Sequence, residues 1–74
     1  MTTIYRATLE TINFDFEAFG GTPDHARDAL SRGLRVHCKQ YNVSYHDLIS
    51  AFIHEIVVRP IDLGAAYRGS EQLR

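Results

Sequence analysis

Gly20-Gly21-Thr22-Pro23 marks the point at which the hydrophobic period of this chain changes. Before it, apolar and polar residues alternate, which is typical of β-strands with one buried face. After it, apolar residues recur every three to four positions, which is typical of an amphipathic helix. Thr22 is a favoured N-cap residue, and Pro23 suits the first helical position, where no N–H is needed. The stretch therefore predicts a β-hairpin followed by a long helix.

The register of this hairpin can be predicted from its two faces. One pairing places Leu9 opposite Phe14 on an apolar face and Arg6 opposite Glu17 on a polar face, where the two charges attract. The apolar face then packs against the helices. We therefore expect a core that brings together six apolar side chains, which are Leu9, Phe14, Phe16, Leu30, Leu34 and Phe52.

The rest of the chain predicts a second, shorter helix and a third strand. Asn42 is a plausible stop for the first helix, Ser44 is a plausible N-cap for the second, and Pro60 places the last strand at a sheet edge. Gly33, in the first helix, is expected to permit close packing on the sheet. The expected elements are strands over 4–10 and 13–19, helices over 23–41 and 45–54, and a strand over 55–63.

The order β-β-α-α-β predicts an α+β fold. A right-handed crossover after the helices places the last strand beside the first, so the expected sheet is antiparallel with strand order 2-1-3. The helices then cover one face and leave the other open. We expect one domain over residues 1–64, followed by a weakly ordered tail over 65–74 that shows no periodic pattern.

Composition narrows the possible functions. The chain has 74 residues, a formal net charge of −1 and one cysteine. This balance argues against a general nucleic-acid-binding protein, which would be strongly basic. A single cysteine, Cys38, and an N-terminus without a signal-peptide pattern predict a cytoplasmic protein in a reducing compartment.

The histidines and the cysteine form no recognisable catalytic or metal-binding motif. His46 and His54 are two helical turns apart, too far to share one ion without a loop between them. His37 and Cys38 are adjacent in a helix and so point in different directions. Cys38 also lies on the apolar side of that helix, where cysteine is inert. The sequence predicts no catalytic residue, no metal and no cofactor.

Two surfaces are candidates for binding. The open sheet face is acidic with apolar edges and would suit a basic protein partner, although a solvated face explains it too. A basic stripe on the first helix would suit an anion or a nucleic acid, but it can equally be a solvated face. The predicted partner-binding residues of the sheet face are Ile4, Arg6, Glu10, Asp15, Glu17 and Phe19. The basic stripe consists of Arg32, Arg35 and Lys39.

Residues 16–30, FEAFGGTPDHARDAL, resemble the strand–glycine–threonine–helix passage of HicB-type antitoxins. The resemblance implies a sheet packed by a helix and a protein that binds and masks a small toxin nuclease. It assigns no functional residue of this chain.

The chain also resembles, in kind, the small near-neutral α+β proteins of phages and mobile elements, including anti-CRISPR proteins. These block a protein complex by covering its substrate site. The resulting prediction is a non-enzymatic protein-binding module that inhibits a bacterial defence complex. The alternatives are a HicB-like antitoxin or regulator and a nucleic-acid-binding protein that uses the basic stripe. A homodimer through the second strand or the open sheet face is predicted as well, because a core this small gains from burying more apolar surface.

Overall fold

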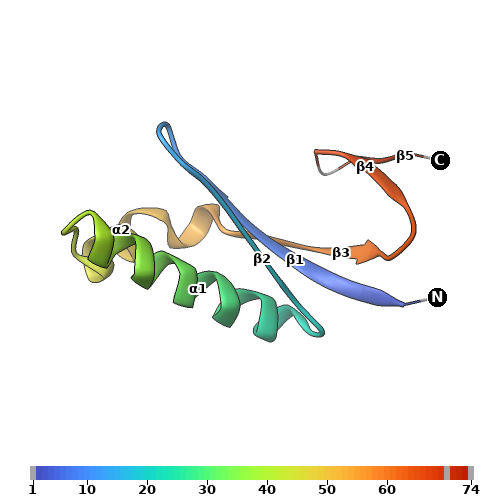
Figure 1. The fold of residues 1–74 in the computed structure, drawn as a ribbon, viewed down its shortest axis with the longest axis horizontal. Helices are drawn as coiled ribbons and strands as arrows, with labels where there is room; N and C mark the ends of the chain where they lie inside the picture. Colours follow the sequence, from blue (N-terminus) through green and yellow to red (C-terminus); the bar gives the residue numbers. More distant parts are fainter. Residues whose placement is uncertain (1, 70, 74) are drawn as a thin grey trace.

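A computed structural model of the chain describes residues 2–69 and 71–73. The elements follow the predicted order β-β-α-α-β, with a 3-10 turn (η1) before the third strand and a short hairpin after it (Figure 1). Their bounds are β1 Thr3–Glu10, β2 Asp15–Gly20, α1 Pro23–Gln40, α2 Tyr45–Phe52, η1 Ile53–Glu55, β3 Val57–Asp62, β4 Ala66–Arg68 and β5 Glu71–Leu73.

The main sheet has the predicted order. It runs β2-β1-β3, and both strand pairs are antiparallel. Helix α1 lies along one face of the sheet, and α2 follows it at the far end of the molecule from the chain termini (Figure 1). The α+β class and the strand order inferred from the sequence are therefore confirmed, and Pro60 does lie in an edge strand.

The ends of α1 follow the local chemistry of the sequence. The Thr22 hydroxyl accepts a hydrogen bond from the His25 N–H at 3.1 Å, which satisfies one of the free amides of the first turn. At the other end, Asn42 adopts a positive φ of 55°, a conformation that asparagine tolerates better than most residues. The Val43 N–H then donates to the Cys38 carbonyl at 2.9 Å, which closes the helix.

The second helix is shorter than predicted. The Ser44 hydroxyl accepts from the Asp47 N–H at 3.3 Å and caps α2 as expected. However, α-helical structure ends at Phe52, and the chain tightens into the 3-10 turn Ile53–Glu55 before the third strand. Glu55, with which the third strand was predicted to begin, lies in that turn, and β3 begins at Val57.

The predicted hairpin register is wrong by two residues. Leu9 lies opposite Phe16, and Arg6 lies opposite Phe19 instead of Glu17. A shift of two keeps every side chain on its predicted face, because the side-chain period of a strand is two. The expected attraction between Arg6 and Glu17 across the ladder is therefore not made.

The turn explains this register. The Thr11 N–H donates to the Phe14 carbonyl at 2.8 Å, so the loop itself is Ile12-Asn13. Neither loop residue has the positive φ that the favoured two-residue turns need. Instead, the Thr11 hydroxyl accepts from the Phe14 N–H at 3.0 Å and donates to the Phe14 carbonyl at 2.7 Å. A side chain thus completes a turn for which the backbone is not suited.

The core contains three of the six residues predicted for it. Leu9, Leu30 and Leu34 are buried together, and the complete buried cluster is Ala7, Leu9, Ala26, Leu30 and Leu34. Phe16 and Phe52 are half-buried and pack against this cluster. Phe14 was placed in the core wrongly, since it is 40% exposed at the end of the hairpin. The two-residue shift moves it from the ladder into the turn.

The glycine that brings α1 close to the sheet is Gly20. A Cβ at Gly20 would lie 2.4 Å from the backbone nitrogen of Ala26, whereas a Cβ at Gly33 would meet nothing within 4 Å. The close-packing role predicted for Gly33 is wrong, because Gly33 lies on the exposed side of the helix. The end of β2 meets the first turn of α1 at Gly20.

The segment predicted as a tail contains the second, two-stranded sheet of the structure. Strands β4 and β5 pair antiparallel, with Ala66 opposite Leu73. Ser70 and Arg74, which also belong to this segment, lie outside the described residues. The hairpin lies across the main sheet from α1 (Figure 1). This position makes it part of the candidate site.

Candidate functional site

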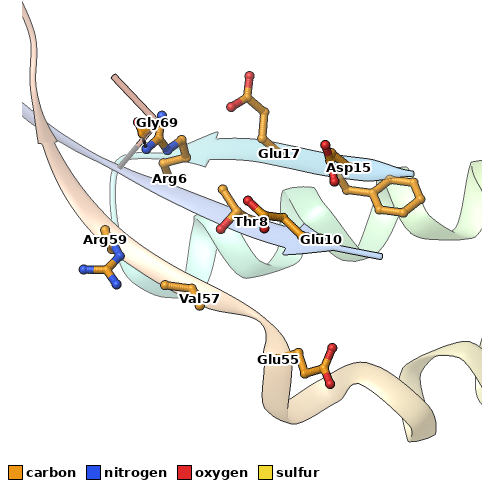
Figure 2. A pocket seen from close by; sticks show the side chains of 10 residues that line it. Arg6, Thr8, Glu10, Asp15, Glu17, Glu55, Val57, Arg59 and Gly69 are labelled. Carbon is orange, nitrogen blue, oxygen red and sulfur yellow. Dashed lines mark hydrogen bonds between the residues drawn. The ribbon is translucent and has the colours of Figure 1, made fainter. Parts of the chain in front are cut away.

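The candidate site is a hollow on the open face of the main sheet. The strand pleat alternates side chains between the two faces, so β1, β2 and β3 each contribute every second residue to this face. The hollow has a volume of about 660 Å³ (Figure 2). Its lining residues are Arg6, Thr8, Glu10, Asp15, Phe16, Glu17, Glu55, Val57, Arg59 and Gly69.

The centre of the hollow is a row across the three strands. Thr8 lies opposite Glu17 on one side and opposite Val57 on the other. Next to this row, Arg59 lies opposite Arg6. The strand register thus fixes the floor of the hollow.

The C-terminal hairpin forms the wall at one end. The Arg6 Nη2 donates to the Gly69 carbonyl at 2.9 Å, and the Asp62 N–H donates to the Tyr67 hydroxyl at 2.8 Å. These two bonds attach the hairpin at the end of the open face where Ile4 pairs with Ile61. Ile61 is only 9% exposed although it points away from α1. The hairpin therefore covers one end of this sheet face, and the part that stays open lies between the hairpin and the β1–β2 turn.

Charge is divided between the two ends of the hollow. Arg6 and Arg59 lie toward the hairpin, whereas Glu10, Asp15 and Glu55 lie toward the turn and η1 (Figure 2). With Glu17, the lining contains four carboxylates and two guanidinium groups. Among the described residues, none of these carboxylates forms an ion pair or a side-chain hydrogen bond. The acidic end therefore has negative charge that nothing in the described chain neutralises.

One pair of these carboxylates is placed at some cost to stability. Glu10 and Asp15 lie directly opposite each other in the β1–β2 ladder. Like charges in such a position are destabilising, typically by a few tenths of a kcal/mol to about 1 kcal/mol. Both side chains are exposed, so solvent reduces the repulsion without removing it. The arrangement favours binding of a cationic group between them.

The structure brings together four of the six residues predicted on the sheet face. Arg6, Glu10, Asp15 and Glu17 line the hollow, whereas Ile4 pairs with Ile61 near the hairpin. Phe19 lies outside the hollow, 48% exposed, and faces Arg6 across the ladder.

The sequence analysis did not name the other lining residues as site residues. Thr8 and Val57 follow from strand alternation, and so does Arg59 once strand order and register are known. Glu55 belongs to η1, and no sequence pattern predicts how the chain passes from this 3-10 turn into β3. Gly69 reaches the site through the C-terminal hairpin, for which no periodic pattern exists.

The basic stripe lies on α1, away from the hollow, and its three members differ. All three side chains are exposed, but Arg35 also contacts α2. The Arg35 guanidinium lies 4.2 Å from the centre of the Tyr45 ring, a cation–π contact between α1 and α2. Arg35 thus has a structural contact that the sequence analysis did not anticipate.

His37 belongs to an aromatic cluster that joins the hairpin to α1. Its ring centre lies 4.6 Å from that of Phe14, 4.9 Å from that of Phe16 and 4.7 Å from that of Tyr41. Cys38, next in the chain, is a buried free thiol. Within residues 2–69 and 71–73, no three His, Cys, Asp or Glu side chains are grouped so that they could hold a metal ion.

The comparison with protein-family models, curated proteins and solved structures found no match for this chain. No helix in the described part of the chain combines the length and the hydropathy needed to cross a membrane.

Proposed function

We propose that this protein is a non-enzymatic protein-binding module whose open sheet face covers a basic surface of its partner. The observation that carries the proposal is the hollow on that face, with its four carboxylates that have no cationic partner in the described chain. A partner that brings Lys or Arg side chains to these carboxylates gains Coulomb energy and relieves the repulsion between Glu10 and Asp15.

The chemistry of the hollow favours a protein over a nucleic acid at this face. Phosphate groups would be repelled by Glu10, Asp15 and Glu17, and the lining contains four carboxylates against two guanidinium groups, one of which, that of Arg6, also bonds a backbone carbonyl. Arg59, at the other end, can pair with an acidic side chain of the same partner. Both signs of charge on one surface give an interface that selects orientation as well as partner.

Within this function, we propose that the partner is a bacterial defence complex and that binding blocks its substrate site. Complexes that bind nucleic acids do so through basic surfaces. An acidic face such as this one competes with nucleic acid for such a surface. A small toxin nuclease would present the same chemistry, so the antitoxin-like function is the alternative outcome of the same experiment. Both functions fit a cytoplasmic protein.

The homodimer predicted from the sequence uses the same strand and the same face. Self-association and partner binding would therefore compete for Phe19 and the carboxylates. The oligomeric state of the free protein has to be measured together with its binding.

The test compares two charge reversals of equal size. Tagged wild-type protein captures its partner from a bacterial lysate, and the purified partner is then titrated with wild-type, Asp15→Lys and Asp28→Lys protein. Asp15 lines the hollow, whereas Asp28 is exposed on α1. We expect Asp15→Lys to weaken binding about tenfold or more and Asp28→Lys to leave it near the wild-type value. Wild-type affinity should also fall as salt is raised, because the attraction is electrostatic.

A second measurement tests the inhibitory role. Wild-type protein should displace nucleic acid from the purified partner, and Asp15→Lys should fail to do so at the same concentration. Equal binding by the two charge-reversal variants would contradict the sheet face as the binding surface. Direct binding of nucleic acid to the protein itself, lost on Arg32→Glu, would instead favour the basic stripe.

A further inference from the structure

The hydrogen bonds of the turn show which backbone groups of β2 face outward. Because the Thr11 N–H donates to the Phe14 carbonyl, these two residues form a hydrogen-bonded pair. Such pairs alternate with non-hydrogen-bonded pairs along an antiparallel ladder. Counting from the turn, Asp15, Glu17 and Phe19 fall in the non-hydrogen-bonded pairs with β1. Their N–H and C=O groups therefore point away from β1, toward the open edge of the sheet.

The opposite edge of the sheet, formed by β3, is less able to pair with another strand. The same alternation, continued across β1, turns the backbone groups of Val58, Pro60 and Asp62 toward the outer edge of β3. Pro60 has no N–H, and the Asp62 N–H donates to the Tyr67 hydroxyl at 2.8 Å. Two of three outward donor positions on β3 are therefore unable to pair with another strand.

The edge of β2 has no such protection. Its sequence, DFEAFG, contains neither proline nor lysine, and the side chains of Asp15, Glu17 and Phe19 are all exposed. In the described part of the chain, the backbone groups of these three residues make no hydrogen bond to any turn, loop or cap. An edge of this kind is a template for one more strand.

We infer that β2 binds an extended segment of the partner as an added antiparallel strand, with Lys or Arg opposite Asp15 and Glu17 and an apolar residue opposite Phe19. The inference rests on the proposed function and specifies how the partner is recognised. Residues directly opposite each other in a ladder point to the same face. The basic side chains of the added strand therefore lie on the open face, beside the carboxylates of the hollow, and its backbone bonds the three outward residues.

Charge separates this occupant from a second copy of the chain. Two β2 strands paired around a two-fold axis near Glu17 would bring carboxylates of both copies together, and Arg6 lies opposite Phe19, not opposite either carboxylate. Like charges across a ladder are destabilising. The acidic edge thus disfavours self-pairing and favours a basic segment.

The experiment uses the whole protein and a labelled hexapeptide, Thr-Phe-Thr-Lys-Thr-Lys. In the antiparallel register its Phe lies opposite Phe19 and its two Lys residues lie opposite Glu17 and Asp15. Fluorescence anisotropy compares this peptide with two N-methylated forms of equal charge. One carries the methyl group on the first Lys, whose N–H faces β2. The other carries it on the following Thr, whose N–H faces away.

We expect methylation of the Lys amide to weaken binding about tenfold or more, because it removes a backbone hydrogen bond and blocks close approach. Methylation of the Thr amide should leave the affinity within about twofold of the parent peptide. On binding the parent peptide, the amides of Asp15, Glu17 and Phe19 should become slower in hydrogen exchange. These readouts leave the protein unaltered, so none depends on a variant that might not fold.

Other outcomes overturn the inference in distinguishable ways. Equal affinity of the two methylated peptides would show that the peptide binds by charge alone, which leaves the proposed function intact. If the peptide does not bind but Asp15→Lys still weakens binding of the partner, the added strand is likewise contradicted and the proposed function stays intact. Loss of both effects would contradict the proposed function too. A wild-type protein that is dimeric through β2 would assign the edge to a second copy.

Discussion

Gly20 and Gly33 differ in the space around them, so replacing each by alanine should affect stability differently. Gly20 approaches the first turn of α1 so closely that a Cβ would lie 2.4 Å from the Ala26 nitrogen and 2.6 Å from the His25 carbonyl carbon. These are backbone atoms, which cannot move aside as a flexible side chain can. Gly33 is in the middle of α1 with open space around it.

We therefore predict opposite effects for the same substitution. Gly20→Ala should destabilise the fold by about 1–3 kcal/mol, the usual range for overpacking. Gly33→Ala should stabilise it by about 0.5–1 kcal/mol, because alanine has the higher helix propensity. Denaturant unfolding measures both. A stabilised Gly20→Ala variant would mean that β2 and α1 are further apart than the structure places them.

Asp15 allows a residue-scale test in which stability and binding move in opposite directions. Asp15→Lys replaces the repulsion with Glu10 by an attraction, so the free energy of unfolding should rise by about 0.2–1 kcal/mol. Asp15→Asn, which only removes the repulsion, should give a smaller rise. Both variants should bind the partner more weakly than wild type. Thermal unfolding at low and high salt measures the effect, which should shrink as salt increases.

At the scale of elements, the sequence specified which elements form and which faces they bury. The change of period at Gly20–Pro23 located the hairpin and α1, and the Thr22 cap is formed as its residue type predicts. The strand order followed from the handedness of the crossover. Each of these features depends on chemistry within a few residues or on a general rule of chain geometry.

The features that could not be predicted depend on contacts between distant residues or on unusual turns. Strand alternation fixes the face of each side chain but allows a register shift of two, and Thr11 decided between the two possibilities. As a result, Glu17 and Arg6 do not pair, and Phe14 moves out of the core. Four of the ten lining residues come from η1, β3 and the C-terminal hairpin. The hydrogen bond between Arg6 and Gly69 joins residues far apart in the chain.

The role of the Thr11 hydroxyl gives a prediction for the hairpin. Thr11→Val keeps the side-chain shape but removes the two hydrogen bonds that the hydroxyl makes to Phe14, so the fold should lose about 1–3 kcal/mol of stability. Thr8→Val is the matched control, because the Thr8 hydroxyl makes no hydrogen bond among the described residues. It should be near neutral. Equal losses in both variants would indicate that the turn does not depend on the hydroxyl.

The oligomeric state is the property that the whole molecule decides. Two features favour a dimer. The core is small, and the edge of β2 has no proline or lysine and lies beside Phe19, which is 48% exposed. Against it is the register, which puts Phe19 and not Glu17 across from Arg6, so that the carboxylates of two copies would meet without a cation between them. The balance between exposed apolar surface and like charge therefore determines whether two copies associate.

We predict that repulsion prevails in the wild-type protein and that removing it produces the dimer. Light scattering at micromolar concentration should give a mass near one chain, 8.4 kDa, for wild type and about twice that for the double variant Asp15→Asn/Glu17→Gln. Adding Phe19→Lys to the double variant should restore the monomer while the helix content measured by circular dichroism stays the same. A wild-type dimer would show that apolar burial at β2 outweighs the charge repulsion. A double variant that stays monomeric would show that something other than the carboxylates prevents pairing at this edge.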